Sequence, residues 1–202
     1  MTTPPAAAPA TDSTTAAPTA LVPLVDGFET IEAMAVVDVL RRAGVLVTTA
    51  GVGSTRVTSS HGVTVEADAL LADALRQPSW TAIVLPGGPG TPKLLEAPGL
   101  PDALRQLHAE GRLLAAICAA PTVLAALGLL DGRRACCFPA AEPRMNGATL
   151  SQDRVVEDGT IITSRAAGTA VEFALAVAAR LAGPQRARQV AESILHIAPA
   201  AS

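Results

Sequence analysis

The 202-residue sequence lacks an excess of charge of either sign. It has 15 Lys and Arg against 18 Asp and Glu, a formal net charge of −3. Proteins that attract nucleic acid or anionic lipid by electrostatics carry a clustered positive charge, which this composition does not supply. The composition therefore argues against nucleic acid as a partner.

The sequence also lacks the motifs of common metal, disulfide and nucleotide sites. Its three cysteines, Cys118, Cys136 and Cys137, form no CxxC and no Cys/His metal spacing, and two of them are adjacent. Neither GxxxxGK[ST] nor GxGxxG occurs. We therefore expect no metal, no organic cofactor and a reducing compartment.

A secretory signal is missing as well. Residues 1–20 are almost wholly Ala, Thr and Pro, without the basic start and the apolar stretch of roughly 7–15 residues that a signal peptide has. Such a composition buries little apolar surface and favours a disordered tail. We expect a tail at 1–20, a single domain at 21–197, a short tail at 198–202, and a cytoplasmic location.

One long uncharged stretch, "LLAAICAAPTVLAALGLL" at 113–130, raises the possibility of a membrane span. A span needs ~20 predominantly apolar residues. This stretch is rich in alanine, is interrupted by Pro121, and has no counterpart elsewhere in the chain. We interpret it as a buried strand that runs into a helix, with no membrane as a partner.

The rest of the chain alternates short apolar runs with helical periodicity. Strands that are apolar on both faces are predicted at 20–25, 45–52, 81–88 and 113–118. Further elements are expected as a helix over 31–44, a hairpin over 55–67, a helix to about 127, strands over 134–138 and 154–164, and helices over 169–183 and 185–195. This order predicts an α/β fold with a doubly wound, mostly parallel sheet in a three-layer α/β/α sandwich.

Ligands of open α/β sheets lie beyond the carboxyl ends of the strands. Three predicted strands are followed there by "DGFETIE" (26–32), "PGGPGTP" (86–92) and "CAAP" (118–121). We expect these three loops to converge and to form the functional site.

Cys118 stands where the fourth strand gives way to a helix that begins near Pro121. At such a nucleophile elbow, unpaired backbone N–H groups and the helix dipole would lower the pKa of the thiol from about 8.5. The alternative is a plain core cysteine, because free cysteine is among the most buried residue types.

Two other features of the converging loops can serve a reactive thiol. Gly87 and Gly88 let the backbone approach a ligand and can turn N–H groups toward an oxyanion, although glycines are common in ordinary loops. Glu32 lies in the first turn of its helix, where it is either a solvated acid that complements the helix dipole or a carboxyl that hydrogen-bonds the thiol and relays protons.

Four motifs in order, "LVPLVDGFETIEAMAVVDVLRRAG", "IVLPGG", "AAICAAP" and "ITSRAAGTAVEFALA", resemble the ThiJ/PfpI superfamily and its Parkinsonism-associated deglycase clade. The resemblance covers about residues 20–195. It implies a flavodoxin-like fold, usually a homodimer, a nucleophilic and readily oxidised Cys118, and Glu32 as its partner acid. It also implies an oxyanion loop at Gly87 and Gly88, with Ala119 supplying the next N–H.

The sequence departs from that resemblance at one position and leaves several others open. Phe138 stands where many members carry a histidine near the thiol, which removes a base. His61 lies in the predicted hairpin, where relatives often have a basic residue that reaches the partner subunit's pocket. Gly168 and Thr169 match a loop that closes around the pocket, or are simply a helix start. His108 and His196 are interpreted as solvated side chains.

A cysteine with a neighbouring carboxyl and no histidine favours addition to an aldehyde over peptidase chemistry. We expect glyoxalase III or deglycase activity, in which Cys118 attacks methylglyoxal or glyoxal and Glu32 relays protons to give a 2-hydroxy acid. The rival is a redox-sensing stress protein or chaperone in which Cys118 is oxidised to a sulfinate. Cys136, expected to share a strand face with Phe138, could then point to the pocket and form a disulfide. We favour the alternative, in which Cys136 and Cys137 are buried structural thiols on that strand.

Overall fold

The structure is a computed structural model that describes residues 16–77 and 80–196. Most of the predicted N-terminal tail, residues 1–15, and the whole predicted C-terminal tail at 198–202 lie outside the described residues. The first strand begins at Thr19 and pairs there with Leu46. Residues 19 and 20, which were predicted as tail, are therefore part of the sheet.

A seven-stranded sheet forms the centre of the described residues, in the order β10-β11-β7-β6-β1-β2-β5. Every pair is parallel except β10 with β11. The strands are β1 (Thr19–Leu24), β2 (Leu46–Gly51), β5 (Ala69–Leu70), β6 (Ala82–Leu85), β7 (Leu113–Ile117), β10 (Val155–Asp158) and β11 (Ile161–Ser164). β1, β6 and β7 are central and almost wholly buried, as their unbroken apolar runs predicted.

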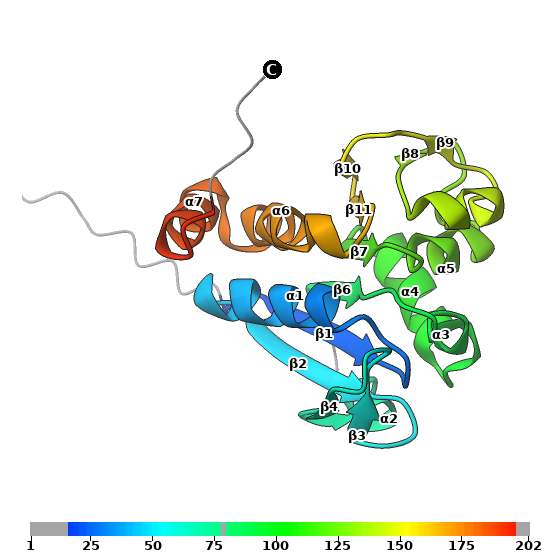
Figure 1. Cartoon of the computed structure of the whole chain (residues 1–202), viewed down its shortest axis with the longest axis horizontal. Coiled ribbons are helices and arrows are strands. Elements are labelled where there is room, and N and C mark those ends of the chain that lie inside the picture. Colours follow the sequence, from blue (N-terminus) through cyan, green and yellow to red (C-terminus); the bar gives the residue numbers. More distant parts are fainter. Residues whose placement is uncertain (1–15, 78–79, 197–202) are drawn as a thin grey trace, which may run out of the picture.

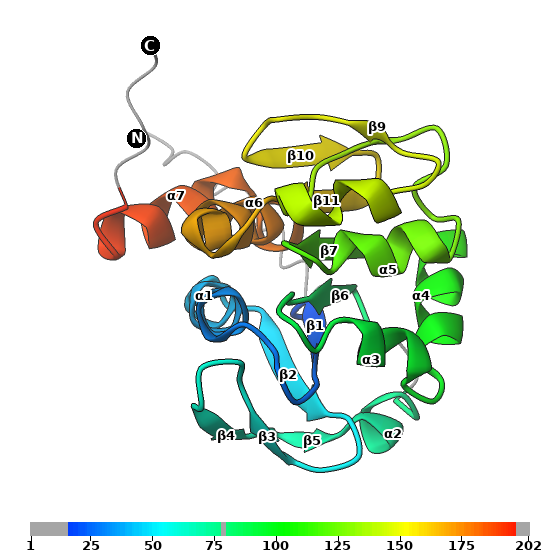
Figure 2. The same ribbon diagram turned by 45° about the vertical axis from the view of Figure 1, so that its right-hand side comes forward.

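Helices cover both faces of this sheet (Figures 1 and 2). One face carries α1 (Thr30–Arg42), α6 (Ala170–Ala182) and α7 (Pro184–Ser193), whose apolar side chains share one core. The other face carries α2 (Leu71–Ala74), α3 (Pro92–Glu96), α4 (Leu100–Ala109) and α5 (Pro121–Ala126). The doubly wound three-layer sandwich predicted from the sequence is confirmed.

α1 shows how the sequence sets the packing. Ala33, Val36, Val37 and Leu40 recur at helical spacing and are all buried, so the apolar stripe predicted from the sequence is the face that packs on the sheet. The same stripe brings Glu32, one position before Ala33, to the edge of the core. A carboxyl group is thereby carried into the interior at the carboxyl end of β1.

The hairpin predicted over 55–67 is confirmed as β3 (Arg56–Thr58) and β4 (Thr64–Glu66), which pair antiparallel. The strand predicted over 134–138 is correct only at its start. β8 (Arg134–Ala135) pairs with β9 (Thr149–Leu150) outside the main sheet, and a 3₁₀ helix, η1 (Pro139–Arg144), follows. The strand ends early because the Cys136 N–H donates to the Thr163 hydroxyl rather than to a neighbouring strand.

The uncharged stretch at 113–130 divides into β7, the Cys118 turn and α5. Among the residues that the structure describes, none of the helices has the length and apolar character that crossing a bilayer requires.

Candidate active site

Cys118 occupies the turn between β7 and α5 with a left-handed backbone, φ +64°. That conformation is uncommon for a residue other than glycine and is strained unless the surroundings hold it. Here the Cys118 N–H donates to the Ser164 carbonyl at 2.9 Å, and the Cys118 carbonyl accepts from the Phe138 N–H at 2.8 Å. Neighbouring segments therefore fix the elbow that the sequence predicted.

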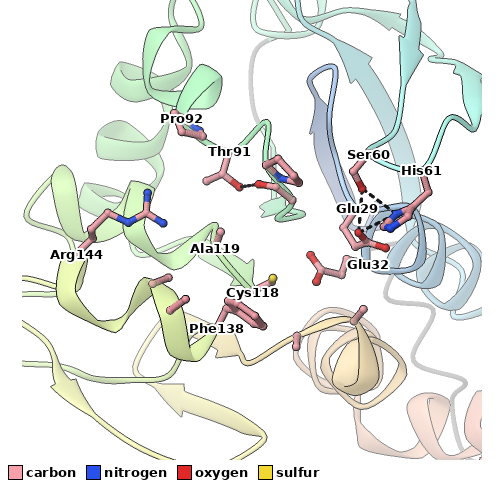
Figure 3. A pocket seen from close by; sticks show the side chains of 16 residues that line it. Glu29, Glu32, Ser60, His61, Thr91, Pro92, Cys118, Ala119, Phe138 and Arg144 are labelled. Atoms are coloured by element: carbon pink, nitrogen blue, oxygen red, sulfur yellow. Dashed lines mark hydrogen bonds and ion pairs between the residues drawn. The ribbon is translucent and has the colours of Figure 1, made fainter.

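The Cys118 sulfur faces a cavity of about 620 Å³ at the carboxyl ends of the central strands (Figure 3). The three loops predicted to converge all reach it: Glu29 and Glu32 from the first, Gly88 and Pro89 from the second, and Cys118 from the third. The other lining residues are Ser60, His61, Thr91, Pro92, Ala119, Phe138, Ala140, Ala141, Arg144, Ala166 and Ala167.

Glu32 is fully buried, so of its two predicted environments the solvated one is wrong. Its Oε2 accepts a 2.8 Å hydrogen bond from the Gly87 N–H. Its Oε1 has no hydrogen-bond partner that meets ordinary geometry among residues 16–77 and 80–196. Burial raises the pKa of this carboxyl to about 7, against the opposing effects of the Gly87 N–H and the Cys118 thiol. Glu32 can thus gain or lose a proton near neutral pH.

The expected lowering of the pKa of Cys118 is wrong for the resting protein. Burial, and then the negative charge of the adjacent Glu32 carboxylate, raise the pKa of Cys118 to about 12. The N–H groups of Ala119 and Gly88 lower the pKa of the thiol, but by less than burial and Glu32 raise it. Cys118 and Glu32 are therefore a coupled pair that carries one negative charge at most near neutral pH.

Gly87 and Gly88, both predicted as oxyanion donors, have different roles in the structure. Gly87 donates its N–H to Glu32 and does not line the cavity, so it positions the acid and is not an oxyanion donor. Gly88 and Ala119 do line the cavity, and their N–H groups face the Cys118 sulfur. These two N–H groups are the ones placed to hold an oxyanion formed beside the thiol.

Replacing Gly87 by alanine should destabilise the protein and disable the site. An added Cβ would lie 2.8 Å from the Cys118 Cβ and 2.8 Å from the Ile117 carbonyl oxygen, closer than real contacts allow. We expect unfolding free energy to fall by about 1–3 kcal/mol, as in overpacked cores. Gly168→Ala is the matched control, because nothing lies within 4 Å of its Cβ. Thermal denaturation of both variants checks this, and equal stabilities would contradict it.

His61 contacts its own chain's site. Its Nδ1 lies 3.0 Å from the Ser60 Oγ and 3.5 Å from the Glu29 Oε2, and the Ser60 hydroxyl donates to the same Glu29 oxygen at 3.1 Å. The three side chains line one wall of the cavity (Figure 3). These contacts all lie within one subunit, and the reach of this position toward a partner subunit stays a prediction.

Of the three remaining candidates, Phe138 lines the cavity, and Gly168 and Thr169 belong to a loop beside it. Phe138 lines the cavity as the residue that precedes η1, not as part of a strand. Gly168 and Thr169 do not line it; Thr169 is buried and hydrogen-bonds Ser164 and Ala166, so it anchors the loop that brings Ala166 and Ala167 there.

The other polar candidates lie outside the cavity. Cys136 is fully buried against Thr163 and does not line the cavity, which confirms the buried structural thiol and not the alternative of a thiol that points to the pocket. The strand that would have aimed it there ends at Ala135. His108, on α4, and His196, after α7, do not line it either. His108 is only partly exposed and its Nδ1 is buried, so it is less solvated than predicted.

Sequence reasoning missed Glu29, Ser60 and Arg144 as parts of the site. Glu29 stands three residues before Glu32, one helical turn away, and that spacing could have indicated a second carboxyl on the same side. Nothing in the sequence around Arg144 distinguishes it from the other surface arginines.

Comparisons with known proteins agree with this architecture. The model of the DJ-1/PfpI family matches residues 18–180. Protein dj-1beta of Drosophila melanogaster is 42% identical over 180 residues, which cover 87% of this chain and 96% of that protein. The crystal structure of Drosophila DJ-1beta superposes with a TM-score of 0.87 at 40% identity, covering 91% of this chain and 100% of that one.

A relative with an enzyme name also matches. Glutathione-independent glyoxalase DJR-1.2 of Caenorhabditis elegans is 36% identical over 159 residues, covering 78% of this chain and 85% of that protein. The family model spans well over half of the chain, and the Drosophila relative aligns along 96% of its own length. The chain therefore belongs to the DJ-1/PfpI family.

Proposed function

We propose that this protein converts small α-oxoaldehydes, such as methylglyoxal and glyoxal, into 2-hydroxy acids without a cofactor. The observation that carries the proposal is the pairing of Cys118 with the buried carboxyl of Glu32 in one cavity. The glyoxalase name of the nematode relative supports the same reaction class.

The first step joins the thiol to the aldehyde. The Cys118 sulfur forms a bond to the aldehyde carbon C1, the C1=O π bond breaks, and the thiol proton passes through Glu32 to the new oxygen. The N–H groups of Gly88 and Ala119 hold that oxygen while it is negatively charged. The product of this step is a neutral hemithioacetal, and Glu32 is again ionised.

The second step moves hydrogen from C1 to C2. Glu32 takes the C1 proton, and the electron pair left behind forms an enediolate across C1 and C2. Protonation of C2, with transfer of the C1 hydroxyl proton to the C2 oxygen, gives a thioester. Water then adds to the thioester carbonyl, and the thiol leaves with a proton. The sum is addition of one water to the oxoaldehyde, with no oxidant or reductant consumed.

The test is formation of lactate from methylglyoxal by the purified protein. Cys118→Ala should reduce lactate formation to the uncatalysed background, because no other cysteine lines the cavity. Cys136→Ala removes a buried thiol outside the cavity and should keep turnover near that of the unmodified protein. Full turnover by Cys118→Ala would contradict the proposal.

A second candidate is a redox sensor or protective chaperone that acts through a Cys118 sulfinate. Glu32 is protonated below about pH 7 and could donate a hydrogen bond to a sulfinate oxygen. The raised pKa of the thiol disfavours rapid oxidation, since the thiolate is the form that reacts. If Cys118 does act as such a sensor, mild peroxide adds two oxygens to it in spite of the raised pKa, and an unchanged mass counts against this role.

The resemblance to the family also leads us to propose a cytoplasmic homodimer. Ile31 on α1 and Val63 beside β4 are 57% and 46% exposed, which leaves large apolar side chains that a second copy could cover. The three described cysteines are free, as suits a reducing compartment. Light scattering on the purified protein checks the dimer, and a monomer mass at micromolar concentration would contradict it.

A further inference from the structure

We propose that His61 is a second acid–base residue of the site and delivers the proton that C2 of the substrate receives. This inference rests on the proposed function, in which one group must take a proton from C1 and a proton must then reach C2. Glu32 is placed to serve C1, because it adjoins the sulfur to which C1 is bonded. The C2 side needs a donor elsewhere on the cavity wall.

The hydrogen bonds around His61 fix which of its nitrogens is free. A carboxylate only accepts, so the Ser60 hydroxyl donates its one proton to the Glu29 Oε2. The Ser60 oxygen must then accept from His61, which places a proton on Nδ1. Nε2 has no hydrogen-bond partner among the described residues and is the nitrogen that can exchange a proton with a substrate.

Glu29 holds the His61 ring from its Nδ1 side. Its Oε2 lies 3.5 Å from the His61 Nδ1, and its side chain is only 16% exposed against 73% for His61. Nδ1 is thus directed toward the Glu29 carboxylate and the Ser60 hydroxyl, which leaves Nε2 as the nitrogen open to a substrate. Because Glu29 precedes α1 and His61 follows β3, folding of the hairpin against the helix start assembles this pair.

The order of groups along the cavity fits a substrate bonded to the sulfur. In Figure 3, Glu32 lies between Cys118 and the group formed by Glu29, Ser60 and His61. A chain attached at C1 to Cys118 would therefore meet Glu32 first and the histidine next. Since Phe138 has no proton to exchange, His61 is the imidazole that lines this cavity within the described residues.

With Glu32 as the base and His61 as the acid, every proton taken up in the reaction is also released. Glu32 begins ionised and takes the C1 proton; His61 begins protonated and gives the Nε2 proton to C2. Glu32 then releases its proton to water and His61 takes one from water, which restores both. The hydrogen that arrives at C2 therefore comes from solvent and not from the aldehyde.

The experiment measures lactate formation from methylglyoxal by the full chain and by His61→Ala and His61→Asn. We expect kcat to fall about 10²-fold in both, the scale of general acid–base catalysis. Asparagine can keep the donor to Ser60, so a merely structural role would leave His61→Asn active. Free imidazole added to His61→Ala should restore turnover at least about tenfold, within that catalytic range, because the position is open to solvent.

A second readout follows the hydrogen itself. In D₂O the unmodified protein should give lactate with deuterium at C2, whereas a proton carried intact by Glu32 alone would leave the aldehyde hydrogen there. Unchanged kcat in His61→Asn, or retained aldehyde hydrogen, would overturn the role of His61 while lactate formation stands. Absence of lactate from the unmodified protein would instead overturn the proposed function. The rate of Cys118 alkylation should differ little between the variants and confirms that the site is folded.

Discussion

Glu32→Gln should make the protein more stable at pH 8 and leave its stability nearly unchanged at pH 4.5. Burial raises the pKa of Glu32 in the folded protein from 4.5 to about 7. The folded state thus binds a proton more tightly than the unfolded chain. This contribution to stability is fully present below about pH 4.5 and is lost as the pH rises through about 7.

The size of the effect follows from the same two values. At ~1.4 kcal/mol per pH unit, the interval from 4.5 to about 7 corresponds to an upper limit of about 3.5 kcal/mol at pH 8. Glutamine carries no charge to desolvate and its amide oxygen can still accept from the Gly87 N–H. We expect a gain of about 1–3 kcal/mol at pH 8, or several degrees in melting temperature.

Urea denaturation of both proteins at pH 4.5, 6 and 8 would measure this difference. Glu96→Gln, an exposed position on α3, controls for the loss of a negative charge and should show no such dependence on pH. A stability difference between Glu32→Gln and the unmodified protein that stays constant from pH 4.5 to 8 would contradict the assigned pKa.

Glu32→Gln should also make the Cys118 thiol more reactive toward iodoacetamide while abolishing turnover. The adjacent Glu32 carboxylate raises the pKa of Cys118, second to burial. Removing its negative charge should lower the pKa of the thiol and so increase the fraction of thiolate. Alkylation depends on the thiolate, so its rate at pH 8.5 should rise, by about tenfold for each unit that the pKa falls.

Turnover should fall in the same variant by about 10²–10⁴-fold, because the amide cannot take the C1 proton. Alkylation of Cys118, identified by peptide mapping against buried Cys136 and Cys137, separates the two effects. The difference in alkylation rate should shrink below pH 7, where Glu32 is protonated. Slower alkylation of Glu32→Gln at pH 8.5 would mean that Glu32 activates the thiol instead of holding it neutral.

Much of the fold follows from apolar pattern alone. β1, β6 and β7 are unbroken apolar runs, which a sheet covered on both faces requires, and α1 buries the stripe that its spacing predicted. The prediction of a strand through Cys136 was wrong because the Cys136 N–H, which strand pairing would use, donates to the side-chain hydroxyl of Thr163 on β11. Such a contact joins residues 27 positions apart and has no local signal.

In the candidate site, too, some features could be predicted from the sequence and others could not. The placement of Cys118 directly after β7 and of Glu32 at the start of the helix that follows β1 could be predicted, because strand ends in a parallel sheet meet at one edge. The role of Gly87 could not, since its N–H was free to serve either an oxyanion or an acid until the loop was folded. The raised thiol pKa also escaped prediction, because it depends on burial and on the distance to one carboxylate rather than on the elbow itself.

The contacts of His61 could not be predicted from the sequence. Its partner Glu29 is 32 positions away, and only the docking of the β3–β4 hairpin against the start of α1 brings the two together. The backbone bonds from Gly27 to Thr58 and from Ser60 to Phe28 hold that docking. A pattern within either segment does not reveal it.

Native mass spectrometry of Glu32→Gln mixed with methylglyoxal tests most directly whether the Cys118 sulfur attacks the aldehyde. This variant keeps the nucleophile, and water can replace Glu32 in moving the thiol proton to the new oxygen. It cannot remove the C1 proton, so the hemithioacetal should accumulate. The account predicts a gain of the mass of one methylglyoxal, located on Cys118 and absent from a variant that also carries Cys118→Ala. The account would be contradicted if the unmodified protein turned over methylglyoxal while neither it nor Glu32→Gln ever carried that mass on Cys118.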